Sequence, residues 1–600
     1  MQRSKREQLG IIQTADALAV IRRYHEETKH HFHRYARSLG YMDWANQPDP
    51  FRRYAGAPTV RLPLLAPDEE PRSPRYDAVF ATGAVPAQPV TIRSLSRFFE
   101  YTLAISAWKQ AGEVRWALRS NPSSGNLHPT EGYVVVGSVP GLTLGPGTYH
   151  YVSKDHLLEQ RAACSVELYD SLMKTFPPQA FIFGLTSIHW REAWKYGERA
   201  YRYCQHDAGH ALGAARIAAA TLGWGMLVLA DMSDDSIETL LGIGRESDYQ
   251  DAEREQPDCL AVIWPMGTGS RLRLAAAGAC PPVRGQTPEE GGQSPVPLFL
   301  DVGVVEKLAQ CHWYGKANRL SRDHEIDWEI IEEVAEAAWK PPGEGRIIEV
   351  PVAPALSPRG RGEGEGARPT AAQIIRQRRS AVAFDWRTFI TRDVFYQMLS
   401  RVMPRVDLST GSRPMPWDAI PWEPTIHLAL FVHLVHGLSP GLYLLARVRA
   451  KVPTLRQAMH PHFLWQVPAG CPEDLPLYLL EEGDTRRLAA QVSCHQEIAG
   501  AGAFSLGMLA EFDESLDKHG PWFYRCLFWE TGVIGQVLYL EAEAAGVRAT
   551  GIGCFFDDPV HQVFGLKDTR VQSLYHFTVG GPVEDDRLTT LPAYEEQARG

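Results

Sequence analysis

Apolar and polar residues alternate along the chain with two different periods, and each period predicts a kind of element. A helical period over Ser94–Gln110 predicts an amphipathic helix, and Tyr201–Leu222 is apolar nearly all round, which predicts a buried helix ending at Gly223. Runs of β-branched and aromatic residues predict buried strands. These runs are Tyr133–Val136, Tyr149–Val152, Met226–Ala230 and Cys259–Trp264.

Two segments interrupt this pattern and predict linkers. Residues 281–297 are rich in Pro, Gly and Gln, and residues 341–369 contain a run of Arg-Gly and Glu-Gly pairs. A helix is expected between them over 325–340. We therefore divide the chain into an N-terminal extension (1–90), a first domain (91–280), a linker region (281–369) and a second domain (370–600).

The second half of the chain repeats the first. An offset of 323 residues aligns 201–243 with 524–566 without a gap. The identical pairs are Tyr201/Tyr524, Arg202/Arg525, Gly209/Gly532, Ala219/Ala542, Gly223/Gly546, Asp234/Asp557, Asp235/Asp558 and Gly242/Gly565. Because these identities fall on helix ends and turns, where a shared backbone would place them, we infer a duplication.

Composition and charge exclude several classes of protein. With 44% apolar and 22% charged residues, the chain has ordinary globular composition. A formal net charge of -10 without a dense block of Lys and Arg argues against nucleic-acid binding. The longest apolar run, Ile426–Leu445, holds three histidines and a proline, which are costly in a bilayer, so no membrane span is expected.

The cysteines and the N-terminus suit a cytoplasmic protein. None of the nine cysteines forms a C-x-x-C pair, so neither a zinc module nor a disulfide framework is expected. Residues 1–10 are polar and charged, unlike a signal peptide. A segment with His25, His30, His31 and His33 lacks an acid or a cysteine paired with it at ligand spacing, and we assign it no metal.

The most informative stretch is the polar loop Arg119–Glu131, which reads Arg-Ser-Asn-Pro-Ser-Ser-Gly-Asn-Leu-His-Pro-Thr-Glu. Its prolines, glycine and serines fix a rigid turn that offers backbone N–H groups and short hydroxyls to a planar polar ligand. Composition alone favours an ordinary turn before a strand. With the run Tyr133–Val136 after it, however, the loop resembles the flavin-contacting loop of the nitroreductase superfamily. It is most similar to the SagB-type dehydrogenases, which include the thiazoline and oxazoline oxidases.

This resemblance implies an α+β fold built from two FMN-dependent nitroreductase-like domains, each an antiparallel-rich sheet flanked by helices. Family members are homodimers that bind FMN at the subunit interface. The two halves of this chain should therefore form a pseudo-dimer within one chain, which is compatible with a monomer.

The resemblance also implies one complete composite flavin site. The first half supplies the loop residues Pro122, Ser123, Ser124 and Asn126. The second half supplies Arg376, Arg378, Arg379 and Ser380, the segment Gly551, Ile552 and Gly553, and the family-like positions Gln496 and Arg587. Planar guanidinium groups suit a phosphate dianion, and Thr370-x-x-Gln373 before the arginines has the spacing of a capping box.

A second composite site, in which the two halves exchange roles, would be incomplete. The second half has Arg413–Thr425 where the loop should be, without Ser-Ser-Gly-Asn, and the first half has no Arg-Arg-Ser segment. We therefore predict one FMN per chain. In azoline oxidases a Lys-Tyr pair lies over the flavin and is implicated in proton removal, and Lys195-Tyr196 resembles this pair. The second copy has no Lys-Tyr in His519–Arg525.

Three functions stay open at this point. The first is an FMN-dependent oxidoreductase of SagB type that passes hydride between a substrate and flavin N5, with the azoline ring of a modified peptide as a candidate substrate. The second is NAD(P)H-driven reduction of nitroaromatics or quinones. The third is a non-catalytic scaffold that binds flavin or a peptide. Destruction of the flavin itself is a further superfamily activity. Small molecules or modified peptides are the expected partners.

Overall fold

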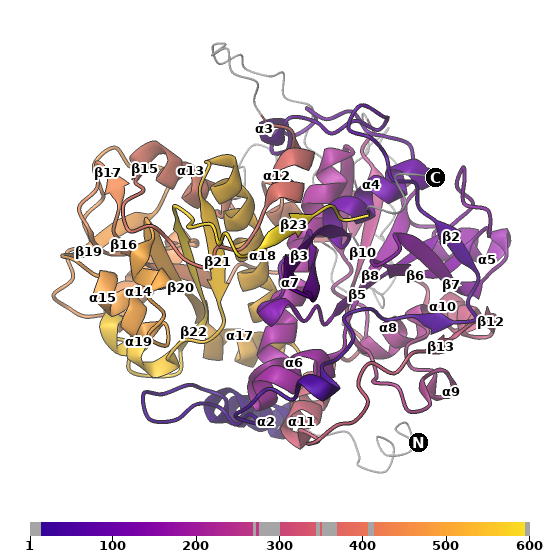
Figure 1. Ribbon diagram of the computed structural model, residues 1–600, viewed down its shortest axis with the longest axis horizontal. Coiled ribbons are helices and arrows are strands. Elements are labelled where there is room, and N and C mark those ends of the chain that lie inside the picture. The colour runs from indigo at the N-terminus through magenta and orange to yellow at the C-terminus, as the bar shows by residue number, and fades with distance from the viewer. Residues whose placement is uncertain are drawn as a thin grey trace, which may run out of the picture.

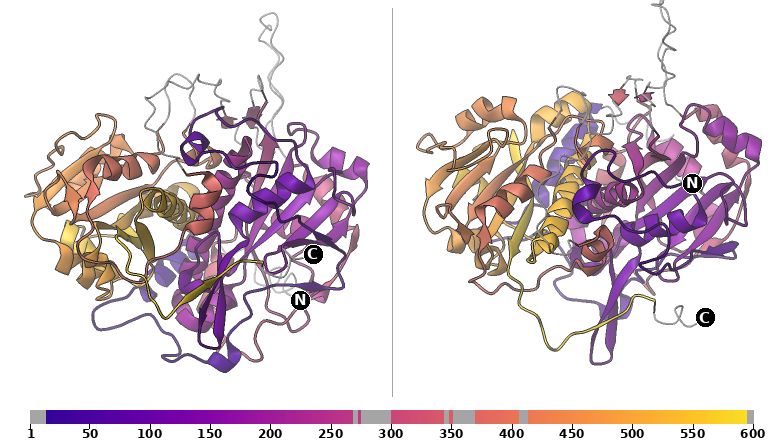
Figure 2. Two further views of the ribbon diagram at one scale, coloured as in Figure 1. Left: turned by 45° about the horizontal axis from the view of Figure 1, so that its top comes forward. Right: turned by 90° about the horizontal axis from the view of Figure 1, so that it is seen from above.

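A computed structural model describes residues 14–267, 272–274, 300–343, 348–350, 369–405 and 413–594. The predicted linker 281–297 and most of 341–369 lie outside these residues. Two β-sheets stand on either side of a pair of long central helices, as Figure 1 and the view from above in Figure 2 show. The predicted α+β fold with two antiparallel-rich sheets flanked by helices is confirmed.

The first sheet has the strand order β12-β7-β6-β5-β8-β10-β9, with β2 also paired to β7, and all its pairs are antiparallel. Its strands are β2 (Thr59–Arg61), β5 (Thr130–Val136), β6 (Gly147–Val152), β7 (Leu157–Ala163), β8 (Phe181–Ser187), β9 (Trp224–Val228), β10 (Gln256–Pro265) and β12 (His312–Trp313). On β5, Val134 and Val136 face the central helices while Tyr133 and Val135 face the outer ones, as the two-residue period of a strand requires.

The second sheet has the order β19-β18-β16-β20-β22-β21, again with antiparallel pairs throughout. Its strands are β16 (Ile426–Val432), β18 (Gly441–Leu445), β19 (Leu477–Glu482), β20 (Phe504–Glu511), β21 (Arg548–Ile552) and β22 (Val571–Gly580). The histidine-containing run 426–445 thus contains strands β16 and β18 of this sheet. Among the described residues, none of the helices has both the length and the apolarity needed to cross a membrane.

The helices form three layers that alternate with the two sheets. Between the sheets lie α7 (Ala200–Thr221) and α18 (Phe523–Ala544), together with α4 (Ile92–Thr102), α12 (Ala371–Gln377) and α13 (Arg392–Arg401). The outer face of the first sheet packs on α5 (Val166–Leu172), α8 (Asp234–Leu241) and α10 (Val302–Ala309). The outer face of the second sheet packs on α14 (Val452–Ala458), α15 (Arg486–Val492) and α19 (Asp557–Phe564). At the bottom of Figure 1, α2 (Thr14–Glu27) lies beside α11 (Glu329–Ala337).

The offset of 323 residues holds for three consecutive helices. The pairs α6 (His189–Tyr196) with α17 (Phe512–His519), α7 with α18, and α8 with α19 begin and end at equivalent positions. Gly209 and Gly532 meet where α7 crosses α18. A Cβ at Gly209 would lie 2.4 Å from the Trp529 carbonyl oxygen, and one at Gly532 would lie 2.4 Å from the His206 carbonyl oxygen. Close backbone approach therefore requires glycine on both helices.

The repeated charged residues pair reciprocally between the two halves. Arg202 of the first half donates to Asp557 of the second at 2.9 Å, and Arg525 of the second half donates to Asp234 of the first at 2.9 and 3.0 Å. Each residue of one pair is the repeat equivalent of a residue in the other. A two-fold interface has this property, because the same patch contacts itself from both sides. The repeats therefore form the predicted pseudo-dimer within one chain.

One predicted helix is partly wrong. The amphipathic segment Ser94–Gln110 is helical only to Thr102, and β3 (Ile105–Ala111) follows it. Strand β3 pairs with β4 (Val114–Arg119) and with β23 (Thr589–Leu591), which reaches across from the far end of the chain (Figure 1). This pairing partner is remote in sequence, so local periodicity could not reveal it. The predicted strand at 226–230 starts two residues earlier, and the helix predicted over 325–340 is shorter.

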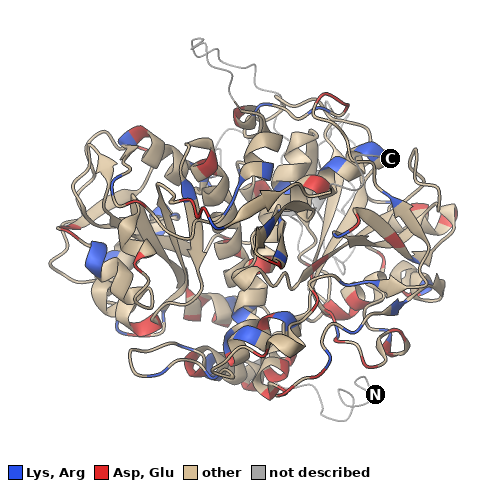
Figure 3. Cartoon of the chain, viewed as in Figure 1, with Lys and Arg blue, Asp and Glu red and all other residues tan. Residues whose placement is uncertain are grey.

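Charged residues of both signs are interspersed over the two halves (Figure 3).

Candidate functional site

The polar loop 119–131 is held in shape by its own side chains. Gly125, Asn126 and His128 have positive φ angles of 57°, 61° and 52°. The Ser123 hydroxyl accepts from the His128 N–H at 2.8 Å, and the Asn126 amide donates to the Ala117 carbonyl at 2.8 Å. These serine and asparagine side chains therefore build the turn, which leaves Gly125 exposed at its tip.

Lys195 and Tyr196 meet the tip of this loop. A Cβ built at Gly125 would lie 2.6 Å from the Tyr196 hydroxyl and 3.1 Å from the Lys195 ammonium. Both residues stand at the end of α6, and the Tyr196 ring packs against the Tyr203 ring of α7 with a centroid separation of 4.4 Å. The structure therefore brings together the two first-half motifs that the sequence singled out.

Two buried carboxyl groups that the sequence analysis did not single out lie behind this pair. Asp207 on α7 accepts from the backbone N–H of Ser124 at 3.0 Å and from its hydroxyl at 3.0 Å. Glu192 on α6 is fully buried, and neither of its oxygens has a hydrogen-bond partner among the described residues. Burial, together with the nearby Asp207 carboxylate, raises the pKa of Glu192 well above its ordinary value. Burial raises the pKa of Asp207 to about 7.

Asp207 left a signal in the sequence, because it is an acid within a helix that is otherwise apolar nearly all round. Glu192 left none, since an acid in the first turn of a helix is usually a solvated residue that complements the helix dipole.

The raised pKa of Asp207 predicts a pH-dependent stability. The folded state binds this proton more tightly than the unfolded state does, so the contribution of Asp207 to stability falls as the pH rises from about 4 to about 7. Asp207→Asn removes this dependence. We expect the variant to gain roughly 1–4 kcal/mol relative to the parent between pH 5 and pH 8, measured as urea midpoints. A difference between variant and parent that is the same at both pH values would contradict the assignment.

Arginines of the second half reach the start of the same loop. Helix α12 begins with the predicted capping box, which is confirmed because Thr370 and Gln373 bond reciprocally. At its end, the buried Arg378 guanidinium donates to the carbonyl oxygens of Arg119 at 3.1 Å and Ser120 at 3.3 Å. Its Nη1 is buried without a hydrogen-bond partner among the described residues.

The two arginines near Arg378 in the sequence, Arg376 and Arg379, differ in whether they form an ion pair. Arg379 donates to the Ser106 hydroxyl of β3 at 3.3 Å, and neither it nor Arg378 forms an ion pair within the described part of the chain. Burial, with the nearby Arg378, lowers the pKa of Arg379 to about 10. Arg376 instead pairs with Glu100 of α4. Arg378 and Arg379 are therefore cationic donors without a carboxylate partner, whereas Arg376 already has one.

The segment 551–553 is connected to Ser380 and Arg378 through the side chain of Tyr539. Tyr539 of α18 accepts from the Gly551 N–H at 2.8 Å and bonds the Ser380 hydroxyl at 3.0 Å, while Arg378 lies 5.1 Å from its ring. A Cβ at Gly551 would lie 1.9 Å from the Tyr575 hydroxyl, and one at Gly553 would lie 2.1 Å from the Tyr203 ring. Glycine at both positions thus allows aromatic rings to approach the backbone.

The other residues predicted for the flavin site have separate surroundings. Pro122 is buried in the loop, and Ile552 packs into the outer core of the second sheet. The Gln496 amide donates to the carbonyl oxygen of Cys554 at 2.8 Å, directly after Gly553. Arg587 is 87% exposed and pairs with Asp585 at 2.8 Å.

In the second half, the region equivalent to the polar loop is filled by buried side chains. Segment 413–425 contains the buried Trp417, and Arg447 stacks on its ring at 4.4 Å. Glu530, the repeat equivalent of Asp207, forms a buried ion pair with Arg447 and accepts from the Thr425 N–H at 2.9 Å. The acid is thereby neutralised, in contrast to Asp207 and Glu192 in the first half.

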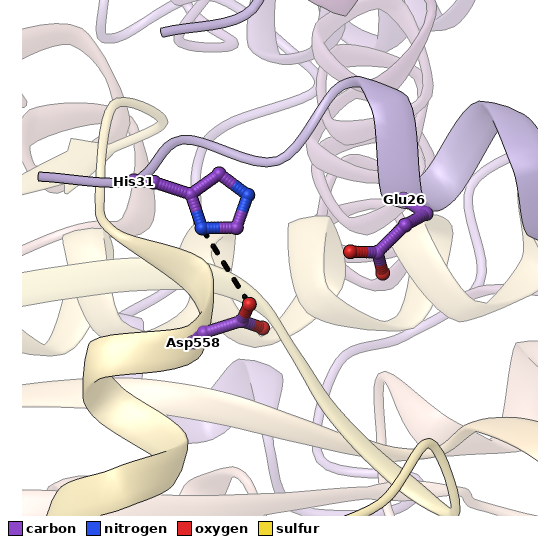
Figure 4. A group of neighbouring side chains, drawn as sticks. All are labelled: Glu26, His31 and Asp558. Carbon is purple, nitrogen blue, oxygen red and sulfur yellow. Dashed lines mark ion pairs between the residues drawn. The ribbon is translucent and has the colours of Figure 1, made fainter. Parts of the chain in front are cut away.

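The histidine-rich segment offers one cluster of metal-ligand type. Figure 4 shows Glu26, His31 and Asp558, whose ligand atoms all lie within 4.8 Å of one another. The Lys29 ammonium, however, lies 2.8 Å from Glu26 and 3.0 Å from Asp558. A cation of the protein itself therefore compensates both carboxylates, and we assign no metal here.

Comparisons with known proteins identify the family to which the two repeated domains are similar. Residues 107–250 and 441–581 each match the sequence model of the nitroreductase family. The chain therefore carries two nitroreductase-family domains in tandem.

Among the proteins similar to this chain are two curated relatives and one solved structure that covers most of its length. The trifolitoxin-processing protein TfxB of Rhizobium leguminosarum bv. trifolii is 32% identical over 129 residues, which is 20% of this chain and 34% of TfxB. MJ1384 of Methanocaldococcus jannaschii, named as a nitroreductase, is 26% identical over 162 residues, 26% of this chain and 77% of that protein. A crystal structure from Anabaena variabilis ATCC 29413, also named as a nitroreductase, has a TM-score of 0.58 and 20% identity, covering 94% of this chain and 99% of its own. This last similarity shows the fold.

Proposed function

We propose that this protein is an FMN-dependent oxidoreductase of SagB type that holds one FMN per chain between its two halves. The observation that carries the proposal is that two further motifs, one from each half, meet the polar loop 119–131. Lys195 and Tyr196 reach its tip, and Arg378 from the other half reaches its beginning. The guanidinium groups of the second half thus lie beside the loop of the first half, where they can offer cationic donors to the phosphate of a flavin.

The chain's own groups fit the phosphate of FMN. A buried guanidinium nitrogen without a partner is costly, and Arg378 Nη1 is in that state. Arg379 beside it also lacks an ion pair within the described residues. A phosphate dianion would supply charge-assisted acceptors for both.

When bound, FMN would supply two-electron chemistry by accepting hydride from the substrate. The protein's residues would handle the proton. Lys195 and Tyr196 lie side by side at Gly125, where the lysine can take a proton from a substrate as a general base. Asp207 and Glu192 behind them are buried acids that can share protons with Lys195.

The proposed substrate is the azoline ring of a modified peptide. This follows from the similarity of the Lys-Tyr pair and the loop to the azoline oxidases. The processing role in the name of TfxB agrees with it.

Lys195→Ala tests the catalytic role. We expect the purified variant to keep its yellow colour and flavin content, while single-turnover oxidation of an azoline-containing peptide slows by about 10²–10⁴-fold because the base is lost. The matched control is Lys518→Ala, since Lys518 is the exposed repeat equivalent of Lys195, and its rate should be unchanged.

Two outcomes would count against this proposal. An unchanged rate in Lys195→Ala would remove this lysine from the mechanism. Rapid bleaching of the flavin by NAD(P)H, with no reaction on azoline peptides, would favour the reductase of nitroaromatics or quinones instead.

A further inference from the structure

Two cysteines from separate segments meet beside the candidate site. Cys494 lies in the turn after α15, in a left-handed conformation with φ of 54°, and Cys554 directly follows Gly553. Their thiols lie close enough to interact electrostatically. The Gln496 amide joins the two segments, because it donates to the carbonyl oxygens of Ser493 at 3.0 Å and Cys554 at 2.8 Å. Both thiols are half-buried, so small reagents can reach them.

The surroundings favour a thiolate on Cys554. The backbone N–H of Ala36 donates to His30 Nδ1 at 2.9 Å, so the proton of the neutral ring resides on Nε2. The His30 side chain lies close enough to Cys554 to interact with it, and its Nε2–H is the donor that remains for the sulfur. The neighbouring Cys494 thiol and His30 ring lower the pKa of the Cys554 thiol. The buried Arg199 guanidinium acts in the same direction.

The N-terminal segment covers this pair. Phe32 packs on Phe556 at 4.7 Å and on His495 at 6.2 Å, so aromatic side chains bridge the two cysteine-bearing segments. Phe32 is 42% exposed. The pair thus lies beneath a thin aromatic cover rather than in the protein core.

We propose that Cys494 and Cys554 are a redox-active thiol pair that reacts with small disulfides. The Cys554 thiolate attacks one sulfur of a disulfide such as oxidised glutathione and expels the other half as a thiolate. The Cys494 thiol then attacks the mixed disulfide at Cys554, releases the second glutathione, and passes its proton to that leaving thiolate. The protein gains an internal disulfide and two glutathione molecules are reduced. This proposal does not rest on flavin binding.

A second pair of neighbouring cysteines provides a contrast. Cys164 and Cys311 lie close enough to interact electrostatically, but burial raises the pKa of Cys164 to about 12. The Cys311 thiol donates to the Lys307 carbonyl instead. A thiol of this kind is a poor nucleophile, so this pair is the internal control.

The test uses the full-length protein, reduced and then treated with oxidised glutathione at pH 7. We expect the nine thiols per chain to fall by two, with one cross-linked peptide joining Cys494 to Cys554 and none joining Cys164 to Cys311. Cys494→Ser should retain one glutathione on Cys554, because the resolving thiol is absent. Cys554→Ser should form neither product. Circular dichroism confirms that both variants are folded.

An unchanged number of thiols in the wild-type protein after this treatment would overturn the proposal. So would a Cys494→Ser variant that carries no glutathione on Cys554, or a cross-link that forms at Cys164 and Cys311 instead. His30→Phe adds a further check, because loss of its interaction with Cys554 should slow the first step about tenfold while leaving the final cross-link unchanged.

Discussion

Replacing Asp557 by alanine is expected to lower the free energy of unfolding by about 3–5 kcal/mol, because it leaves two buried cations without a counter-charge. Asp557 is fully buried and accepts from Arg199 at 3.0 Å, from Arg202 at 2.9 Å and from the His30 N–H at 2.9 Å. The two guanidinium groups hold the pKa of this carboxyl well below its usual range.

Urea unfolding at pH 7 measures this effect. Asp585→Ala is the matched control, since Asp585 pairs with the exposed Arg587 on the surface and its loss should leave the midpoint nearly unchanged. Asp234→Ala should resemble Asp557→Ala, because Asp234 pairs with Arg525 in the reciprocal contact. A midpoint for Asp557→Ala that matches the Asp585 control would show that the buried pair does not hold the two halves together.

Arg378→Ala is expected to weaken FMN binding by about 10–100-fold. A hydrogen bond to a charged group is worth about 1.5–3 kcal/mol, and each 1.4 kcal/mol corresponds to a factor of ten in the dissociation constant. Arg378 is the buried guanidinium whose Nη1 has no partner among the described residues, and its other nitrogens already contact the loop. Its removal therefore takes away both the anion contact and one support of the loop.

Flavin content per chain and fluorescence titration of the flavin-free protein with FMN measure this prediction. We expect about one FMN per chain in the parent and much less in the variant. Arg587→Ala should keep its flavin, because Arg587 is exposed and paired with Asp585. A folded Arg378→Ala protein with full flavin content would place the phosphate elsewhere, and two FMN per parent chain would contradict the single-site proposal.

Much of the architecture could be predicted from local sequence. The 22-residue buried helix α7 and the strands β5, β6 and β10 follow from apolar periods that depend on near neighbours along the chain. The duplication could be predicted as well, because glycines and aspartates keep their spacing over 43 aligned positions of the repeat. Strand β3 could not, because its partner β23 comes from the far end of the chain.

The candidate site shows the same division. The sequence by itself determined which motifs the chain carries: the loop 119–131, the Lys195-Tyr196 pair and the arginines at 376–379. Only the tertiary structure decided that Arg378 reaches the loop while Arg587 is exposed and pairs with Asp585, and that Glu192 and Asp207 are buried beside Lys195. The reason is physical, because the burial and pairing of a charged group depend on elements that fold against it from distant parts of the chain. A motif is local in sequence, whereas the environment that gives it chemistry is not.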